Sequence, residues 1–251
     1  AHPEIGTPGW SSQELKALAI NTAVYPFIRP DNGKAYSLLR VGAGRIDAVA
    51  ALQGRLIAYA ANAPERVSVS FGSIEVLATT SEVRAIRLAN KSTSPISVTV
   101  GYSAVSDLPG VTIAVNVGEI ITVPALGFAS TQVTLTADAS QMARRADPTR
   151  QVTPPDAQPW VDEASGYVSF TPIVTSTTPP IHVPVLALPR VVSALGALST
   201  PIDLASMLTA TVPLTLTGSA ITNAVAPTAT VPLVGVFALT HNSPPLTEIP
   251  N

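Results

Sequence analysis

The sequence of 251 residues contains no cysteine, which excludes disulfide scaffolds, thiolate metal sites and cysteine nucleophiles. Charged residues are also scarce, because Asp, Glu, Lys and Arg make up only 12% of the chain, about half the usual ~25%. An unbroken run of 18 apolar residues and a basic-then-apolar leader are both missing. We therefore expect no membrane helix and no signal peptide in this stretch of sequence.

The charge balance excludes partners that need a strongly basic surface. Fourteen Lys and Arg residues stand against sixteen Asp and Glu residues, which leaves a net charge of -2. Neither nucleic acid nor an anionic membrane surface would attract such a chain strongly. We expect the chain to be a piece of a longer protein, cut at both ends.

Proline and apolar residues are plentiful, and they divide unevenly along the chain. Proline occurs 24 times against 15 glycines, and 46% of the residues are hydrophobic. Residues 1–63 carry six basic and four acidic side chains, residues 64–190 carry eight and ten, and residues 191–251 carry none and two. These shifts predict three parts with boundaries after residues 63 and 190.

The first part contains two predicted helices. Ser11 and Glu14 form a capping box, which predicts a helix over residues 12–22. Its expected buried stripe is Leu15, Leu18, Ala19 and Thr22, with Lys16 and Asn21 outside the stripe. Asp47 caps a second predicted helix that runs to about Tyr59, after Gly42 and Gly44 allow a close backbone approach. Two helices cannot enclose a core, so we expect this part to pack on something outside this sequence.

The second part changes to the alternation of apolar and polar residues that is typical of β-strands. The expected strands cover residues 67–71, 83–90, 96–102, 111–117, 120–123, 129–136, 166–171 and 181–188. Turns rather than helices connect them, which predicts a mainly β fold with an antiparallel sandwich of the fibronectin or immunoglobulin kind. The fibronectin-like version is preferred because a Cys-Trp-Cys pattern is missing.

The third part, residues 191–251, contains two strand-like runs at 211–217 and 231–240. They predict the opening strands of a further β module. An uncharged sheet edge invites pairing with other chains, so we expect a partner or downstream sequence to cover it.

Two motifs in the first part resemble the end of the catalytic domain of subtilisin-like serine peptidases. Residues 8–23 read PGWSSQELKALAINTA, and residues 42–48 read GAGRIDA. In that family the first motif follows the helix that bears the nucleophilic serine, and the second lies in the closing segment of the same domain. The resemblance implies that residues 1–63 are the incomplete end of such a domain. The insertion of residues 5–8 departs from the family pattern and puts the shape of that loop in doubt.

The second part resembles the fibronectin type III-like module of large secreted subtilases of the lactocepin and C5a-peptidase type. The short motifs that carry this resemblance occur in the expected order: VSFG at 69–72, RLANKS at 87–92, PGVT at 109–112, VPA at 123–125, ASGYV at 164–168 and HVPV at 182–185. The third part is similar to the start of a further sheet module in some of these proteins. The resemblance implies an extracellular or cell-surface location.

The chemistry that the resemblance implies belongs to the parent protein. A subtilase needs an Asp/His/Ser triad and an Asn that stabilises the oxyanion, and in the family all four precede the region matched here. Residues 6–8 read GTP, with proline where the nucleophilic hydroxyl would stand. We therefore assign no catalytic residue and expect this chain alone to be inactive.

The candidate contact site is the long proline-rich stretch over residues 137–163. It contains Arg144, Arg145 and Arg150, and Trp160 stands near its end. Long irregular loops on a compact sandwich often carry binding functions. We treat these four residues as a candidate substrate-contact loop, against the plainer interpretation of an unstructured surface excursion.

The remaining polar residues predict no cofactor. His2, His182 and His241 are too scattered to indicate a zinc site. Acidic residues at the end of the long stretch could gather around calcium, but they lack a regular ligand pattern. These are Asp147, Asp156, Asp162 and Glu163.

The function predicted from the sequence is that of the non-catalytic C-terminal portion of a secreted subtilisin-like serine endopeptidase. The chain would brace the catalytic domain and contact protein or peptide substrates of the parent. Its partners would be the remainder of that domain and those substrates. The alternative is a catalytically dead surface protein whose sheet modules act as adhesion or spacer domains.

Overall fold

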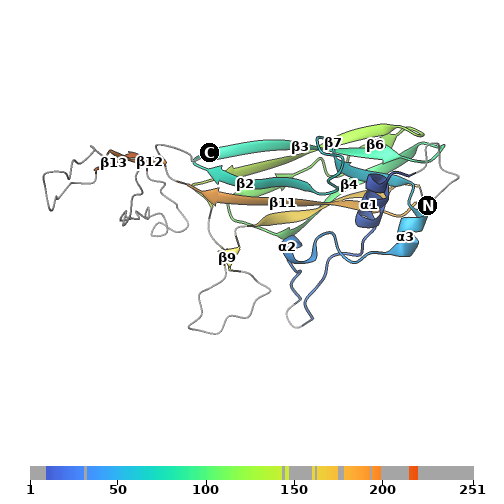
Figure 1. The fold of residues 1–251 in the computed structure, drawn as a ribbon, viewed down its shortest axis with the longest axis horizontal. Helices are drawn as coiled ribbons and strands as arrows, with labels where there is room; N and C mark the ends of the chain where they lie inside the picture. Colours follow the sequence, from blue (N-terminus) through green and yellow to red (C-terminus); the bar gives the residue numbers. More distant parts are fainter. Residues whose placement is uncertain are drawn as a thin grey trace, which may run out of the picture.

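The fold was analysed in a computed structural model. It describes residues 10–30, 33–142, 145–146, 160–161, 163–174, 178–192, 194–198 and 215–219. Two β-sheets pack face to face, with α1 (Ser12–Asn21) and α3 (Ala48–Gln53) at one end of them and α2 (Leu38–Val41) beside their middle (Figure 1).

The two sheets form a mainly β sandwich, as the alternating pattern predicts. One sheet has the order β1 (Leu56–Ala60), β3 (Thr79–Asn90), β7 (Phe128–Asp138) and β5 (Val111–Ala114). The other has the order β2 (Val69–Val76), β11 (Ile181–Val191), β10 (Ala164–Pro172), β4 (Ile96–Ser106) and β6 (Ile120–Val123). All neighbours are antiparallel except β2 and β11, which run parallel. The predicted immunoglobulin-like class is therefore confirmed, and each of the eight predicted strands has its counterpart.

The core lies between the sheets because each strand turns its apolar face inward. In β2, buried and exposed residues nearly alternate, with Val69, Phe71 and Val76 inside. β10 and β11 instead show continuous burial over their first halves, because elements from the first part of the chain cover their outer faces. Phe170 and Val168 of β10 lie fully inside the main cluster.

The first predicted helix is present as α1 (Ser12–Asn21), and its capping box is confirmed. The Ser11 hydroxyl accepts from the Glu14 N–H at 3.2 Å, and the Glu14 carboxylate accepts from the Ser11 N–H at 2.8 Å. The predicted stripe was wrong in part. Ala17, Leu18 and Asn21 are buried, whereas Leu15 is 41% exposed. The buried side is turned by one position from the predicted one, because α1 packs on β1 and β11 and Asn21 bonds backbone groups of both strands.

The second predicted helix begins correctly but ends earlier than expected. Asp47 caps α3 (Ala48–Gln53), and its carboxylate accepts from the Val49 and Ala50 N–H groups at 3.0 Å. The predicted continuation to Tyr59 was wrong, since β1 begins at Leu56 and pairs with β3. β1 is buried on both faces, and a continuous apolar run of this kind does not separate strand from helix by its period. A further short helix, α2 (Leu38–Val41), lies between α1 and α3.

The first part also packs on the sandwich of the same chain, and its expected packing on a body outside this sequence stays a prediction. α1 packs on the sandwich through a second apolar cluster that joins Ala17 and Leu18 to Ile57, Val67 and Ala89. The predicted boundary at residue 63 falls between β1 and β2, and β1 belongs to the sandwich. What the three predicted parts represent stays a prediction.

Short strands complete the described chain. β8 (Arg145–Ala146) pairs with β9 (Trp160–Val161), and β12 (Ala194–Leu198) pairs with β13 (Thr215–Ser219). β13 overlaps the predicted run at 211–217, and the run at 231–240 lies outside the described residues. None of the helices that the structure describes is long and apolar enough to cross a membrane.

Candidate functional site

The predicted substrate-contact residues are only partly within the described structure. Arg144 and Arg150 lie outside it. Arg145 belongs to β8 and Trp160 to β9, and the backbone pairs Arg145 with Val161 and Ala146 with Trp160. The strand pair therefore brings these two predicted positions onto neighbouring strands, and their role in substrate contact stays a prediction.

The histidines and acidic residues that the sequence analysis weighed as metal ligands lie mostly outside the described part of the chain. His2, His241, Asp147, Asp156 and Asp162 lie outside it. Over the described ranges, no three His, Cys, Asp or Glu side chains are grouped so that they could hold a metal ion. His182 and Glu163 instead take part in a buried seam.

This seam joins the sandwich to the segment between α1 and α3. We call that segment, residues 23–30 and 33–46, the finger. Two stretches of backbone pair at its base, where the Val24 N–H donates to the Arg45 carbonyl at 2.7 Å and the Arg45 N–H donates back at 3.1 Å. Gly44, at φ +119°, permits this approach, because a Cβ there would lie 2.2 Å from the Val24 carbonyl oxygen.

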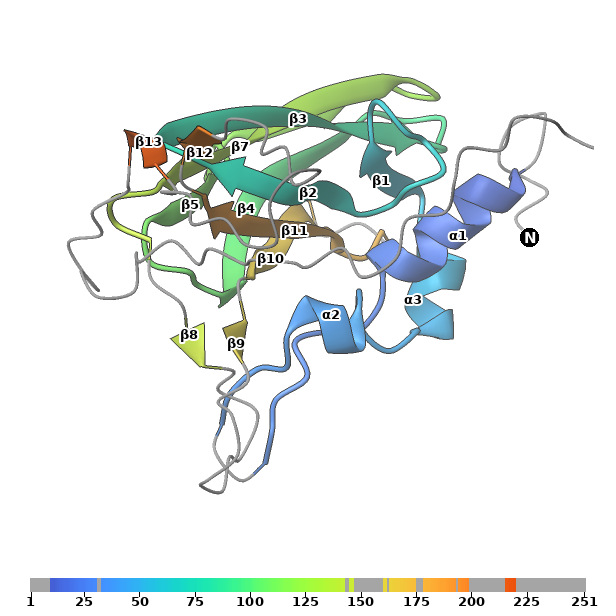
Figure 2. The same cartoon turned by 60° about the vertical axis from the view of Figure 1, so that its left-hand side comes forward.

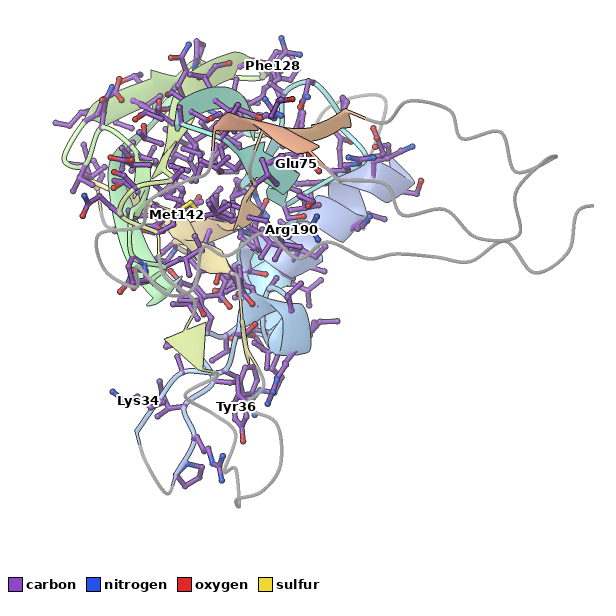
Figure 3. All side chains as sticks on the ribbon, turned by 90° about the vertical axis from the view of Figure 1, so that its left-hand side faces the viewer. Lys34, Tyr36, Glu75, Phe128, Met142 and Arg190 are labelled. Carbon is purple, nitrogen blue, oxygen red and sulfur yellow. The ribbon has the colours of Figure 1, made fainter. Side chains whose placement is uncertain are left out.

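The finger extends away from the two sheets on the side of β10 and β11 (Figure 2). Lys34 and Tyr36 lie at its far end, well away from Phe128 on the sandwich (Figure 3). Its described contacts with the sandwich come from Tyr25, Ser37 and residues 42–43.

Aromatic rings make the centre of the seam. The Tyr25 ring from the finger lies between two rings of the sandwich, with centroid distances of 4.2 Å to Tyr167 and 3.9 Å to His182. Tyr167 and His182 meet edge to face at 5.1 Å. Such offset and tilted contacts are the favourable geometries for aromatic pairs.

Two side chains of the sandwich donate hydrogen bonds to the finger backbone. The Tyr167 hydroxyl donates to the Gly42 carbonyl at 3.1 Å. The Nε2 of His182 lies 3.0 Å from the Ala43 carbonyl. Because a carbonyl only accepts, this nitrogen carries the proton.

Burial changes the titration of the seam. It lowers the pKa of His182 to about 4, although the bond to the Ala43 carbonyl acts in the opposite direction. Burial also raises the pKa of Tyr25, and it raises the pKa of Tyr167 to about 12 with smaller contributions from Tyr25 and Glu163. At neutral pH, His182 and both phenols are uncharged.

Glu163 provides a second contact between finger and sandwich. Its side chain is 1% exposed, and its two oxygens accept from the hydroxyls of Ser37 and Ser165, the latter at 2.5 Å. Ser37 also caps α2 by accepting from the Leu39 N–H at 3.1 Å. The carboxylate thereby ties the start of α2 to the start of β10.

Asn21 at the end of α1 connects the two sheets. It is fully buried, its amide donates to the His182 carbonyl at 2.8 Å, and its oxygen accepts from the Ala58 N–H at 2.8 Å. β1 has only β3 as a neighbour, and β2 begins to pair with β11 only at Val185. The Asn21 amide therefore satisfies two backbone groups that the sheets leave without a strand partner.

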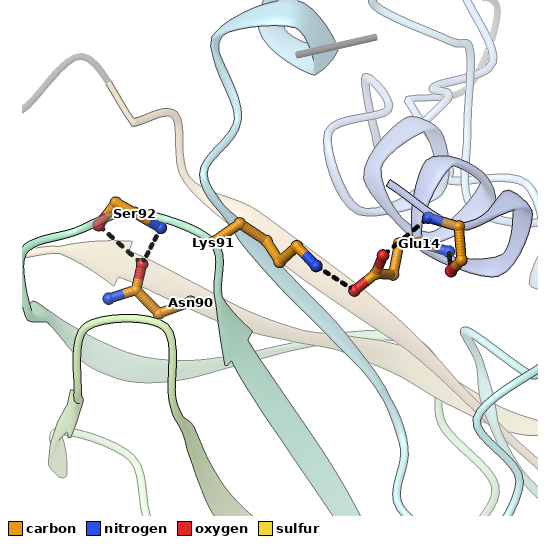
Figure 4. Close-up of polar contacts among 5 residues, drawn as sticks. Glu14, Asn90, Lys91 and Ser92 are labelled. Carbon is orange, nitrogen blue, oxygen red and sulfur yellow. Dashed lines mark hydrogen bonds and ion pairs between the residues drawn. The ribbon is translucent and has the colours of Figure 1, made fainter. Parts of the chain in front are cut away.

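α1 is held at its other end by an ion pair. Lys91, which directly follows β3, lies 2.5 Å from the Glu14 carboxylate (Figure 4). Burial raises the pKa of Glu14, but the bonds and charge from Lys91 and Ser11 outweigh it and lower the pKa. The carboxylate thus serves both the capping box and the contact with the sandwich.

These contacts can hold two structural elements together, and their burial excludes substrate from the polar groups. The sequence interpretation missed the seam. Asn21 stands four residues after Ala17 and three after Leu18, a spacing that puts all three on one helix side. His182 stands within an apolar run over residues 181–188 that contains no charged residue, and such a run signals a strand buried on both faces.

Large apolar side chains remain exposed along the finger and α3. Ile46, Val49 and Leu52 follow one another at a spacing of three and are 67%, 66% and 59% exposed. No residue of α3 is buried, and Ala51 packs partly against the α1 cluster. Others in the same stretch are Val24, Phe27, Ile28 and Leu39.

Comparisons with known proteins add no family. No family model matches the chain, and no curated protein matches it. Among solved structures, the PapD-like domain 7 of human CEP192 is similar at 8% identity, over 74% of this chain and 99% of that one, with a TM-score of 0.32. The SafA pilin with the SafB chaperone of Salmonella enterica is similar at 11% identity, over 59% and 64%, with a TM-score of 0.30. At these scores the likeness carries no argument about function.

Proposed function

We propose that the chain is the non-catalytic C-terminal portion of a secreted subtilisin-like serine endopeptidase, in which the sandwich braces the end of the catalytic domain. The described residues whose motifs resemble the subtilase family, 10–23 and 42–48, belong to α1, the finger and the start of α3. Buried contacts at Asn21, Glu163 and His182 hold this stretch on the sandwich. A brace needs such contacts, because it has to keep two domains in one relative position.

The single observation that carries the proposal is the exposed apolar side of α3. Val49 and Leu52 of α3, and Ile46 just before it, stay exposed although buried contacts fix the neighbouring finger on the sandwich. Contiguous exposed apolar residues on a helix are typical of a surface that another domain covers. In this proposal the covering body is the remainder of the catalytic domain.

The parent would hydrolyse peptide bonds through an acyl-enzyme, with its triad outside this chain. This chain would supply no catalytic group. It would position the closing segment of the catalytic domain, and the stretch around Arg145 and Trp160 would contact the protein substrate. An extracellular or cell-surface location belongs to the same proposal.

The first experiment is to read the coding sequence that precedes Ala1 over about another hundred residues. A Gly-Thr-Ser at a strand-to-helix turn, together with labelling of the expressed parent by a fluorophosphonate probe, is the expected result. A missing or altered nucleophile would overturn the peptidase assignment.

A second experiment tests the brace in that parent. Val49→Asp with Leu52→Asp places two charges on the α3 side that the catalytic domain would cover. The control, Val117→Asp with Val174→Asp, changes two side chains in turns of the sandwich that are 68% and 73% exposed. We expect the α3 pair to lower the peptidase activity and melting temperature of the parent while the control pair leaves both unchanged. In the isolated chain both pairs should leave the stability within about 0.5 kcal/mol.

The second candidate function is a catalytically dead adhesion or spacer protein. The observation that favours it is the sandwich itself, whose seam with the finger buries its polar side chains and so offers none of them to a substrate. The fluorophosphonate labelling separates the two candidates, since a dead parent would take up no probe.

A further inference from the structure

Within the described part of the chain, three groups of contacts join the finger to β10, β11 and the neighbouring Glu163. These are the stacked Tyr25 ring, the bonds from Tyr167 and His182 to the carbonyls of residues 42 and 43, and the link from Glu163 to Ser37. The finger has its own internal backbone bonds, such as those between Val24 and Arg45. These bonds form an isolated bridge, so they open to water when the contacts to the sandwich are lost.

His182 lies at the centre of these contacts. Tyr25 and the Ala43 carbonyl face its ring from the finger, Tyr167 faces it from β10, and the neutral Asn21 amide of α1 binds its main-chain oxygen. Glu163, which directly precedes β10, is bound to two serine hydroxyls and acts on Tyr167. Among the described contacts of the imidazole, none is with a carboxylate.

We propose that protonation of His182 releases the finger from the sandwich while α1 and both sheets stay folded. An imidazolium needs acceptors for two N–H groups, and the described contacts of the ring contain one, the Ala43 carbonyl. The faces of Tyr25 and Tyr167 attract a cation only weakly compared with the hydration that burial removes. Release returns the ring to water and relieves this cost.

The size of the effect follows from the same burial. With a pKa of about 4 in the docked state and about 6.5 in water, lowering the pH from 7.5 to 4.5 weakens docking about 70-fold. His182 takes up a proton more readily when the finger is released than when it is docked. Docking therefore has its full strength above pH 6.5 and weakens as the pH falls toward 4.

α1 has anchors that this protonation does not touch. Ala17 and Leu18 pack on Ile57 and Val67, and Glu14 pairs with Lys91. The expected response is therefore local opening, of the kind that hydrogen exchange resolves within a native protein. This inference does not depend on the proposed function, because every contact in it lies within the described chain.

Hydrogen exchange of the whole chain at pH 7.5 and 4.5 tests the proposal, with each rate corrected for intrinsic exchange at that pH. We expect the protection of the Val24 and Arg45 amides to fall about 70-fold, and the protection of Ile86 and Leu88 in β3 to stay within threefold. In His182→Gln, whose amide can still donate to the Ala43 carbonyl but does not titrate, the finger amides should lose less than threefold.

Two results would overturn the proposal. One is an equal loss of protection of the finger amides in the unaltered chain and in His182→Gln. The other is a loss of the same size at the Ile86 and Leu88 amides of β3. If His182→Gln does not fold, the experiment uses instead the 251-residue chain with His2→Gln and His241→Gln, in which His182 is the sole histidine. An NMR titration of that ring should then show a pKa near 4 and a midpoint shared with the finger amides, and an ordinary pKa near 6.5 would exclude the mechanism.

Discussion

Asn21→Ala tests whether the amide between the sheets is a principal stabilising contact of the N-terminal part. The substitution removes the donor to the His182 carbonyl and the acceptor for the Ala58 N–H, both at 2.8 Å and both buried. A buried group left without a partner costs about 1–3 kcal/mol, so the two together cost about 2–5 kcal/mol. The higher helix propensity of alanine returns a few tenths of a kcal/mol.

The free energy of unfolding at pH 7.5, measured by urea denaturation and followed by circular dichroism, gives the answer. Asn21→Leu is the informative companion, because it restores apolar volume without restoring either hydrogen bond. Lys16→Ala is the matched control on α1, since its bond to the Glu65 carbonyl is exposed, and it should change the stability by less than about 0.5 kcal/mol.

The outcome that refutes the reasoning is specific. If both Asn21→Ala and Asn21→Leu lose less than about 1 kcal/mol, water or a backbone shift satisfies the two groups. If Asn21→Leu restores full stability, the contact acts through packing and its hydrogen bonds contribute little.

Three further predictions concern the finger, its seam and the far end of α1. Gly44→Ala should lower the free energy of unfolding by about 1–3 kcal/mol, because the added Cβ would lie 2.2 Å from the Val24 carbonyl oxygen. Hydrogen exchange should then show that the Val24 amide has lost its protection. The control Gly33→Ala has open space around its Cβ and should leave that amide protected. Lys91→Ala should lower the free energy of unfolding by about 0.5–1 kcal/mol at low salt. The loss should be smaller in 1 M NaCl, because the ion pair with Glu14 is partly exposed and salt screens it. An equal loss at low and high salt would contradict this. Burial raises the pKa of Tyr167 to about 12, so the folded state keeps the phenol proton that the unfolded state loses above pH 10. The free energy of unfolding should therefore fall between pH 10 and 12. Tyr167→Phe should remove this part of the fall in denaturation curves and the corresponding phenolate absorbance at 295 nm.

The sandwich was predictable because its signals are local. The alternation in β7, where Val133, Leu135 and Ala137 face inward, identifies a strand from the residues alone. The capping box at Ser11 and the cap at Asp47 depend on groups within three residues of each other. These features need no knowledge of distant parts of the chain.

β1 shows where local reasoning failed. Its five residues, LIAYA, are apolar on both faces and follow a helix without a proline between, so the period does not decide between helix and strand. Pairing with β3 decides it, through the register from Leu56 opposite Asn90 to Ala60 opposite Ile86.

Composition, alternation and capping act over a few residues, so the fold class, the helix starts and the lack of cysteine chemistry could all be predicted without a structure. Tertiary structure alone decided that Asn21 is buried while Leu15 is exposed, and that Tyr25, Tyr167 and His182 meet in one seam. Asn21 and His182 are separated by 161 positions in the chain. Which backbone groups lack a partner is known only once both sheets have formed, so no local pattern could assign those residues their role.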